Sequence, residues 1–169
     1  VKEGKKIVQA LENAGVNVIN SYVGWHESPR PLITMHVSRG EFVYLAEEVK
    51  KVVKIPVIAA VRINNPFLAE EIVASGKADF VCMGRPLIAD PELPKKALEG
   101  RVEDIRPCIA CNQGCLDRVF TGLSVECCVN AAVGREAEAK IEPTSKPKKV
   151  VVVGGGPGGM EAARVAALR

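Results

Sequence analysis

Four cysteines are the residues of this chain best suited to chemistry. They are Cys108, Cys111, Cys115 and Cys127, in the spacing C-x2-C-x3-C-x11-C. Three clustered thiols, and a fourth that follows after a short intervening segment, can enclose a compact inorganic centre. Cys thiolates bind both iron–sulfur clusters and structural zinc, so the spacing alone does not decide between these two centres. Cys128 adjoins Cys127 and could replace it as the fourth ligand.

A glycine-rich turn near the end of the chain is a second candidate site. Gly154, Gly156 and Gly159 form G-x-G-x-x-G between an all-valine stretch, 150–153, and an Ala-rich helical stretch from Met160. Such glycines permit a tight turn, close approach of a pyrophosphate and close helix–strand packing. The pattern predicts a dinucleotide site for FAD or NAD, and the alternative is a glycine-rich turn without a ligand.

Two arginines each follow a predicted strand. Arg62 ends the run Ala60-Val61-Arg62, and Arg85 follows Gly84. In β/α barrels, phosphate groups commonly bind at the loops after the last two strands. Gly84 would allow close approach of a phosphate, and Arg85 would supply a charge-assisted hydrogen bond. The alternative is that both arginines are solvated loop residues.

His26 lies in the loop after the first predicted strand. Active sites of β/α folds lie at these strand ends, and a histidine there can transfer a proton near neutral pH. A surface or structural histidine is the alternative.

Composition restricts the class of protein. The 169 residues are 47% hydrophobic and 25% charged, which is ordinary for a globular protein. A net charge of +3 does not argue for nucleic acid or an anionic membrane, and no apolar run approaches the ~20 residues of a membrane span. We expect a cytoplasmic protein whose clustered cysteines bind metal rather than form disulfides. The missing initiator Met and signal sequence are expected of a piece of a longer chain.

The elements that would position these groups alternate along the chain. Helical patterns cover 2–14, 41–54, 65–76 and 90–98, and strand patterns cover 16–22, 55–61 and 78–83. This alternation predicts an α/β fold with a parallel sheet. The continuous apolar run at 55–61 predicts a strand buried on both faces, and Cys82 is predicted as a small core residue. The cysteine segment, a charged linker and a fourth strand at 150–153 follow.

An ordered set of motifs resembles one family over essentially the whole chain. The motifs are Gly24-Trp25-His26-Glu27, Arg62-Ile63-Asn64, Met83-Gly84-Arg85-Pro86, Ala89-Asp90-Pro91, Cys108-Ile109-Ala110-Cys111-Asn112-Gln113-Gly114-Cys115-Leu116-Asp117, Val129-Asn130, Gly134-Arg135-Glu136 and the glycine turn. Together they resemble the NADH:flavin oxidoreductase family that includes bacterial 2,4-dienoyl-CoA reductase and trimethylamine dehydrogenase.

The resemblance implies three regions. Residues 1–105 would be the C-terminal part of an FMN-binding TIM barrel, and residues 106–135 would hold a [4Fe–4S] cluster. A linker at 136–147 would lead to the start of a Rossmann-like FAD/NAD(P)-binding domain at 148–169. The isolated chain is expected to be inactive, because the other barrel strands and most of the nucleotide domain are absent from it.

The resemblance also implies roles for single residues. Arg62, Gly84 and Arg85 would contact FMN, mostly at its phosphate. His26 would match the proton donor of the dienoyl-CoA reductases. The four cysteines would ligate the cluster, with Cys127 favoured over Cys128. Ala131 departs from the family pattern, which usually has Pro there, and this leaves the ligands in place.

The implied activity is reduction of activated C=C bonds in a small enoyl-CoA or enone substrate. Electrons would pass from NAD(P)H through FAD and the cluster to FMN, which would deliver hydride while His26 helps protonate the substrate. One alternative is an amine dehydrogenase or demethylase of the same family. The other is a non-catalytic module with a structural zinc site. Zinc sites more often pair two C-x2-C knuckles, whereas these cysteines are split three and one.

Overall fold

The protein is described from a computed structural model that covers residues 1–24, 28 and 34–169. The chain forms two compact units, Val1–Val133 and Gly134–Arg169. All the cysteines lie in the first unit and the glycine turn lies in the second. His26, the predicted proton donor, lies outside the described residues.

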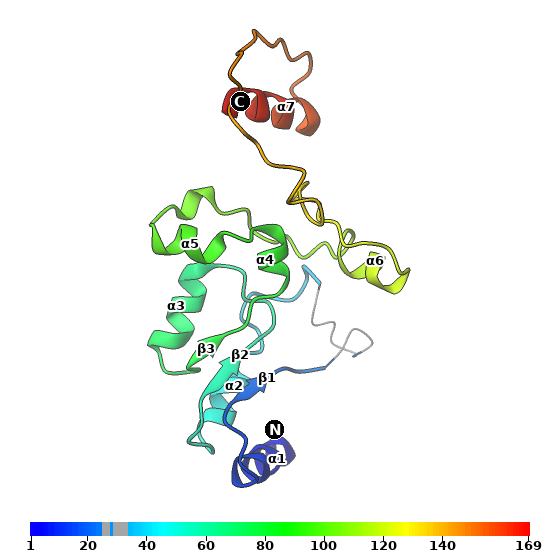
Figure 1. Cartoon of the computed structure of the whole chain (residues 1–169). Coiled ribbons are helices and arrows are strands. Elements are labelled where there is room, and N and C mark those ends of the chain that lie inside the picture. The colour runs from blue at the N-terminus through cyan, green and yellow to red at the C-terminus, as the bar shows by residue number, and fades with distance from the viewer. Residues whose placement is uncertain (25–27, 29–33) are drawn as a thin grey trace. The chain divides into compact units, whose positions relative to one another are not determined.

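A three-stranded parallel sheet forms the centre of the first unit (Figure 1). Its strands are β1 (Ile19–Ser21), β2 (Val57–Ala59) and β3 (Phe80–Val81), in the order β1-β2-β3. Ile19 pairs with Val57, and Ile58 pairs with Phe80. The predicted α/β fold with a parallel sheet is therefore confirmed, although each strand is shorter than its apolar run.

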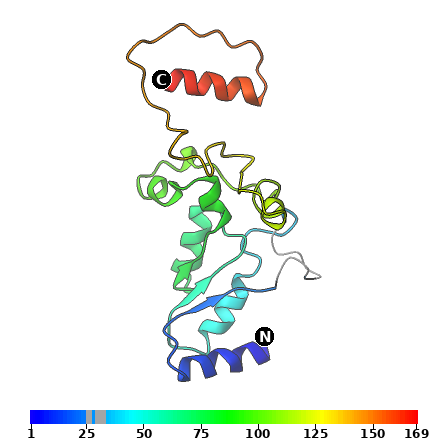
Figure 2. The same ribbon diagram turned by 45° about the vertical axis from the view of Figure 1, so that its right-hand side comes forward.

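Helices follow and flank the strands of the first unit (Figure 2). They are α1 (Lys2–Asn13), α2 (Val43–Lys50), α3 (Pro66–Ala74), α4 (Arg85–Ala89), α5 (Leu93–Leu98), the 3-10 helix η1 (Val102–Asp104) and α6 (Leu116–Phe120). Gly15 and Gly76 follow α1 and α3 with φ of 96° and 72°, the left-handed conformation that ends helices. The side chain of Asn65 caps α3 by accepting hydrogen bonds from the backbone N–H groups of Phe67 and Leu68.

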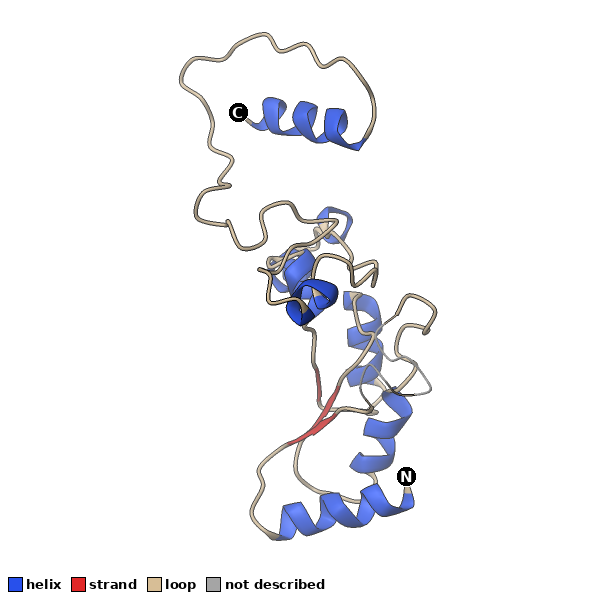
Figure 3. Ribbon diagram, turned by 90° about the vertical axis from the view of Figure 1, so that its right-hand side faces the viewer, coloured by secondary structure: helices blue, strands red, loops and turns tan. Residues whose placement is uncertain are grey.

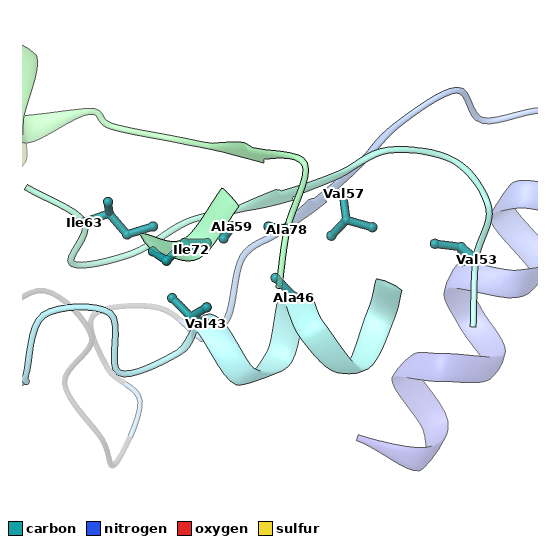
Figure 4. Packing of buried hydrophobic residues seen from close by; sticks show 8 residues of the cluster. All are labelled: Val43, Ala46, Val53, Val57, Ala59, Ile63, Ile72 and Ala78. Atoms are coloured by element: carbon teal, nitrogen blue, oxygen red, sulfur yellow. The ribbon is translucent and has the colours of Figure 1, made fainter. Parts of the chain in front are cut away.

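The core lies between the sheet and these helices. Val57 and Ala59 of β2 are fully buried and pack with Val43 and Ala46 of α2, as Figure 4 shows. Ile72 of α3 joins the same cluster. Burial of these apolar groups stabilises the positions of the strands, so the loops that follow their carboxyl ends begin at fixed points.

The other face of the sheet is open. Asn20, Ile58 and Phe80 form one row across the three strands, and Ile58 is half-buried while the other two are exposed. The prediction that 55–61 is buried on both faces is therefore wrong for this chain. Alternate residues of β2 point to opposite faces, and within the described ranges no second layer covers the row that holds Ile58.

Two local predictions also fail around β3. Cys82, predicted as a core residue, is exposed because it lies two positions after Phe80 and so faces the same open side of the sheet. The segment after Gly84 forms α4, a helix that the sequence did not predict. Pro86 lies in its first turn, where a missing backbone N–H costs nothing. This helix brings Arg85 to the carboxyl end of the sheet.

The second unit contains α7 (Pro157–Leu168) and the glycine turn before it. The predicted strand at 150–153 is not formed, and Figure 3 shows this segment as loop. Its valines are exposed, from 37% for Val152 to 95% for Val153. A strand requires a hydrogen-bonded neighbour, which this unit does not supply. In the part of the chain that is described, no helix is long and apolar enough to cross a bilayer.

Candidate functional site: the cysteine pocket

The predicted ligands converge on one pocket of the first unit. Its walls include Cys108, Cys111, Cys115, Cys127 and Cys128, together with Arg85 of α4. These cysteines are free thiols, and all but Cys128 are half-buried. Residues from two chain segments thus share one small volume. Among the described residues, however, no three His, Cys, Asp or Glu side chains are grouped as the ligands of one metal ion would be.

The backbone around the first cysteines is tightly wound. Ala110 and Asn112 have φ of 54° and 63°, left-handed values that are uncommon outside glycine. The turn lets the backbone N–H of Ala110 donate to Cys108 Sγ at 3.4 Å. Hydrogen bonds of this kind stabilise a thiolate and tune the potential of a centre that it binds.

Gly114 joins the two cysteine-bearing segments. Its carbonyl oxygen accepts a hydrogen bond from Glu126 N at 2.6 Å. A Cβ atom at this position would lie 2.6 Å from Glu126 O and 3.0 Å from Cys127 N. Only glycine therefore permits this approach, which brings Cys127 to the other thiols.

The surroundings affect the thiols differently. Burial raises the pKa of the Cys115 thiol, while the Leu116 backbone N–H and the positive charge of Arg85 oppose that rise. The Cys128 thiol contacts Gln113 Oε1 at 3.6 Å, and its hydrogen bond with Cys111 raises its pKa. Cys127 instead forms an isolated backbone bridge with Asn130. Cys127 is half-buried and Cys128 is exposed, but the contact with Cys111 is made by Cys128, so the choice of Cys127 as the fourth ligand stays a prediction.

The two predicted phosphate-binding arginines lie near each other and near the pocket. Arg62 is held in a left-handed conformation with φ of 58°, and its Nε donates to Val37 O at 2.9 Å. Partial burial and the repulsion of Arg85 lower the pKa of Arg62. Arg85 Nη1 donates to Asn112 Oδ1 at 2.6 Å. Gly84 has open space on its Cβ side, so a ligand can reach the backbone there.

Sequence reasoning gave no role to three asparagines that hold this site together. Asn112 binds Arg85, as above, and buried Asn64 donates through Nδ2 to Cys108 O at 2.7 Å. Asn64 Oδ1 is buried and has no hydrogen-bond partner among the residues that the structure describes. Asn130 is 3% exposed, and its side-chain amide accepts a hydrogen bond at Oδ1 and donates one from Nδ2. The only sequence signal was their position beside the functional motifs.

The glycine turn has the backbone that its sequence predicts. Gly154 has φ of 113°, and Gly156 precedes the first turn of α7. A Cβ atom on Gly159 would lie 1.9 Å from Gly154 O, so the turn and helix pack too closely for a side chain. The contact lies within the turn itself, and the helix–strand packing predicted for the third glycine is not formed, because 150–153 is not a strand.

Comparison with known proteins places the chain in a family. The profile of the NADH:flavin oxidoreductase / NADH oxidase family matches residues 3–104. A metal reductase of Desulforamulus reducens is 58% identical over 99% of this chain and 25% of its own length. An NADH oxidase of Thermoanaerobacter brockii is 54% identical over 100% of this chain and 26% of its own length.

A solved structure extends the similarity to three dimensions. The structure of a 2-naphthoyl-CoA reductase with 2-naphthoyl-CoA superposes with a TM-score of 0.94 at 47% identity. It matches 99% of this chain, which corresponds to 26% of the reductase chain. The chain therefore spans about a quarter of the length of the relatives that it matches.

Proposed function

Because this chain belongs to the NADH:flavin oxidoreductase / NADH oxidase family, we propose that it supplies the electron-relay region of a flavin-dependent oxidoreductase. In this proposal the cysteine pocket would hold a [4Fe–4S] cluster that carries electrons between a dinucleotide cofactor and FMN. The observation that carries the proposal is the pocket itself, in which thiols from two segments meet Arg85.

The donor set fits a cluster. Four half-buried thiols line one pocket, and their sequence positions split three and one, whereas zinc sites more often pair two C-x2-C knuckles. Cys thiolates are the usual ligands of such clusters, and an N–H group already donates to Cys108 Sγ. Cys108, Cys111, Cys115 and Cys127 would be the ligands. This arrangement supports the cluster over the structural zinc site of a non-catalytic module.

The arginines fit the phosphate of FMN. Arg62 and Arg85 repel each other at a partly buried position, and an anion between them would remove that repulsion. Gly84 offers accessible backbone beside them. The residues that would bind the phosphate thus adjoin the residues that would bind the cluster, because Arg85 lines the cysteine pocket.

The second unit would begin the dinucleotide domain. Gly154, Gly156 and Gly159 would accept the pyrophosphate of FAD or of NAD(P)H, and the close contact at Gly159 supports this assignment. The open sheet row of Asn20, Ile58 and Phe80 would face the interior of a completed TIM barrel, with 1–105 as its C-terminal part.

The activity proposed for the complete enzyme is reduction of activated C=C bonds in a small enoyl-CoA or enone substrate with NADH or NADPH. When bound, the flavins and the cluster supply hydride transfer and single-electron transfer. The chain contributes binding and orientation of these groups, and His26 would donate a proton to the substrate. The similarity to a reductase solved with an aryl-CoA thioester supports this substrate class.

An anaerobic substrate screen of the full-length protein tests this activity. Enoyl-CoA thioesters and enones should be reduced with NADH or NADPH, and His26→Ala should lower turnover while FMN content stays unchanged. Oxidation of small amines instead, without reduction of C=C bonds, would assign the protein to the amine dehydrogenase branch. Normal turnover by the FMN-loaded His26→Ala variant would remove the proton-donor role.

Reduction of metal ions is a second candidate activity. A metal reductase is the relative with 58% identity, and a centre that releases single electrons suits such acceptors. Soluble ferric and chromate salts belong in the same screen. If they alone consume NADH, electron transfer to C=C bonds is not the function.

A further inference from the structure

The two ends of the cysteine segment are joined by one polar contact. Arg106 lies just before Cys108, and Asn130 lies just after Cys127. Arg106 Nη1 donates to Asn130 Oδ1 at 3.2 Å. A single side-chain pair therefore closes the loop that carries all the proposed ligands.

Asn130 is also fixed to the neighbouring helix. Its Nδ2 donates to Ile88 O of α4 at 2.9 Å, and its Oδ1 also accepts from Ala132 N at 3.2 Å. Its backbone N–H donates to Cys127 O at 3.3 Å. A buried amide is stable only when it is hydrogen-bonded, so this set of partners restricts Asn130 to one orientation.

The other end of the segment is fixed to the same helix. The backbone N–H of Arg106 donates to Asp90 Oδ2 at 2.9 Å. Asp90 caps the end of α4, is 1% exposed, and also accepts from Lys96 Nζ at 2.7 Å. Both ends of the cysteine segment are thus attached to α4, one through Ile88 and one through Asp90.

We propose that Asn130, with Arg106, is a positioning residue that holds Cys127 in register with the other thiols before any metal binds. This rests on the proposed cluster function and adds to it the residue that preorganises the fourth ligand. Neither residue is among those that line the cysteine pocket. They act on it through the backbone of Cys127, as outer-shell partners act on other metal sites.

The first test measures release of iron from the anaerobically purified full-length protein in excess chelator. Asn130→Ala and Arg106→Ala should each release iron faster, by about 10- to 100-fold, the usual effect of removing an outer-shell partner. The double variant should be no faster than Asn130→Ala, because the two residues act as one pair. Asp79→Ala is the matched control. The Asp79 carboxylate also accepts hydrogen bonds from two partners, Lys50 Nζ and the backbone N–H of Val57, but it lies at the amino end of the sheet.

The second test needs no cluster. In metal-free full-length protein, each thiol is alkylated and its rate is followed by peptide mass spectrometry. Asn130→Ala should raise the rate at Cys127 several-fold and leave Cys108 unchanged, and Asp79→Ala should change neither. A variant that only weakens the whole fold would raise all the rates together.

Two results would overturn the proposal. One is wild-type iron release and Cys127 alkylation in Asn130→Ala. The other is strict additivity in the double variant. If Asn130→Ala does not fold, Arg106→Ala carries both tests, because its backbone bond to Asp90 is retained. If the wild-type protein holds no iron, the proposed function fails, whereas the alkylation test still decides the role of Asn130.

Discussion

At the scale of single residues, Gly114 sets how closely the two cysteine-bearing segments approach. A Cβ atom there would overlap Glu126 O, and the backbone hydrogen bond between these residues would be strained. The same approach brings Cys127 to the pocket. Gly114 does not have a positive φ, so its backbone conformation alone does not require glycine. Glycine is required there because of the close contact with the second cysteine-bearing segment.

We expect Gly114→Ala to lower the iron content of the full-length protein and to destabilise it by about 1–3 kcal/mol, as other overpacked sites do. Iron analysis and urea unfolding measure the two effects. Gly4→Ala is the control, because its Cβ meets open space on α1. Full iron content in Gly114→Ala would show that the close contact is dispensable.

Residue types and spacing identified the thiols, the arginines and the glycines as candidates, and the structure brings the thiols and Arg85 to one pocket. Residue types and spacing were not enough for Asn64 and Asn130. Each of these bonds with residues more than 20 positions away along the chain, Asn64 to Cys108 and Asn130 to Arg106 and Ile88. No local pattern encodes such partners, which is why sequence reasoning assigned these asparagines no function.

At the scale of elements, α4 and α5 form the support of the cysteine segment. Asp90 at the end of α4 pairs with Lys96 of α5, and Lys96 also donates to Asp104 O at 3.0 Å. Burial raises the pKa of Asp90, but the hydrogen bonds from Lys96 and from the Arg106 N–H outweigh it, so the pKa lies below 3.8. The ionised form of Asp90 is therefore the one that stabilises the fold.

We expect Asp90→Asn to lower the free energy of unfolding at pH 7 by about 3 kcal/mol, because it leaves Lys96 buried without its counter-ion. A lowered folded-state pKa contributes stability above the unfolded pKa and loses it as the pH falls through the folded value. The difference between variant and wild type should shrink below about pH 4. Urea unfolding at several pH values measures this.

The control for Asp90→Asn is Glu92→Gln. Glu92 pairs with Lys95 on the surface, with both side chains more than half exposed. Its substitution should change stability by less than about 0.5 kcal/mol at any pH. A pH-independent loss in Asp90→Asn would contradict the ionised role of Asp90.

The glycine turn allows a prediction of the same kind. Gly159→Ala should abolish dinucleotide binding in the full-length protein, since the new Cβ would meet Gly154 O at 1.9 Å. Gly158→Ala, whose Cβ meets open space, should bind normally. FAD content after purification and NADPH titration measure the effect. Normal binding by Gly159→Ala would remove the turn from the proposed site.

Element types were predictable where local signals are strong. Gly15 and Gly76 end α1 and α3, and Asn65 with Pro66 begins α3. The prediction of a strand at 150–153 was wrong, because a β-strand needs a hydrogen-bonded partner strand from elsewhere in the sequence. The α4 helix was missed because its five residues, Arg85–Ala89, are too few for a periodic pattern.

At the scale of the whole molecule, the chain exposes apolar side chains in both of its units. The row of Asn20, Ile58 and Phe80 is open on one sheet face, and the valines of 150–153 are exposed. The chain spans about a quarter of the length of the relatives that it matches. The family could be predicted from the order of motifs, whereas no motif of the chain identifies a substrate.

The central claim is that the cysteine pocket holds an iron–sulfur cluster. The measurement that tests it most directly is the content of iron, acid-labile sulfide and zinc in anaerobically purified full-length protein, for wild type, Cys127→Ser and Cys128→Ser. We predict four iron and four sulfide per chain in wild type and Cys128→Ser, and loss of both in Cys127→Ser. A colourless wild-type protein with stoichiometric zinc would contradict the account.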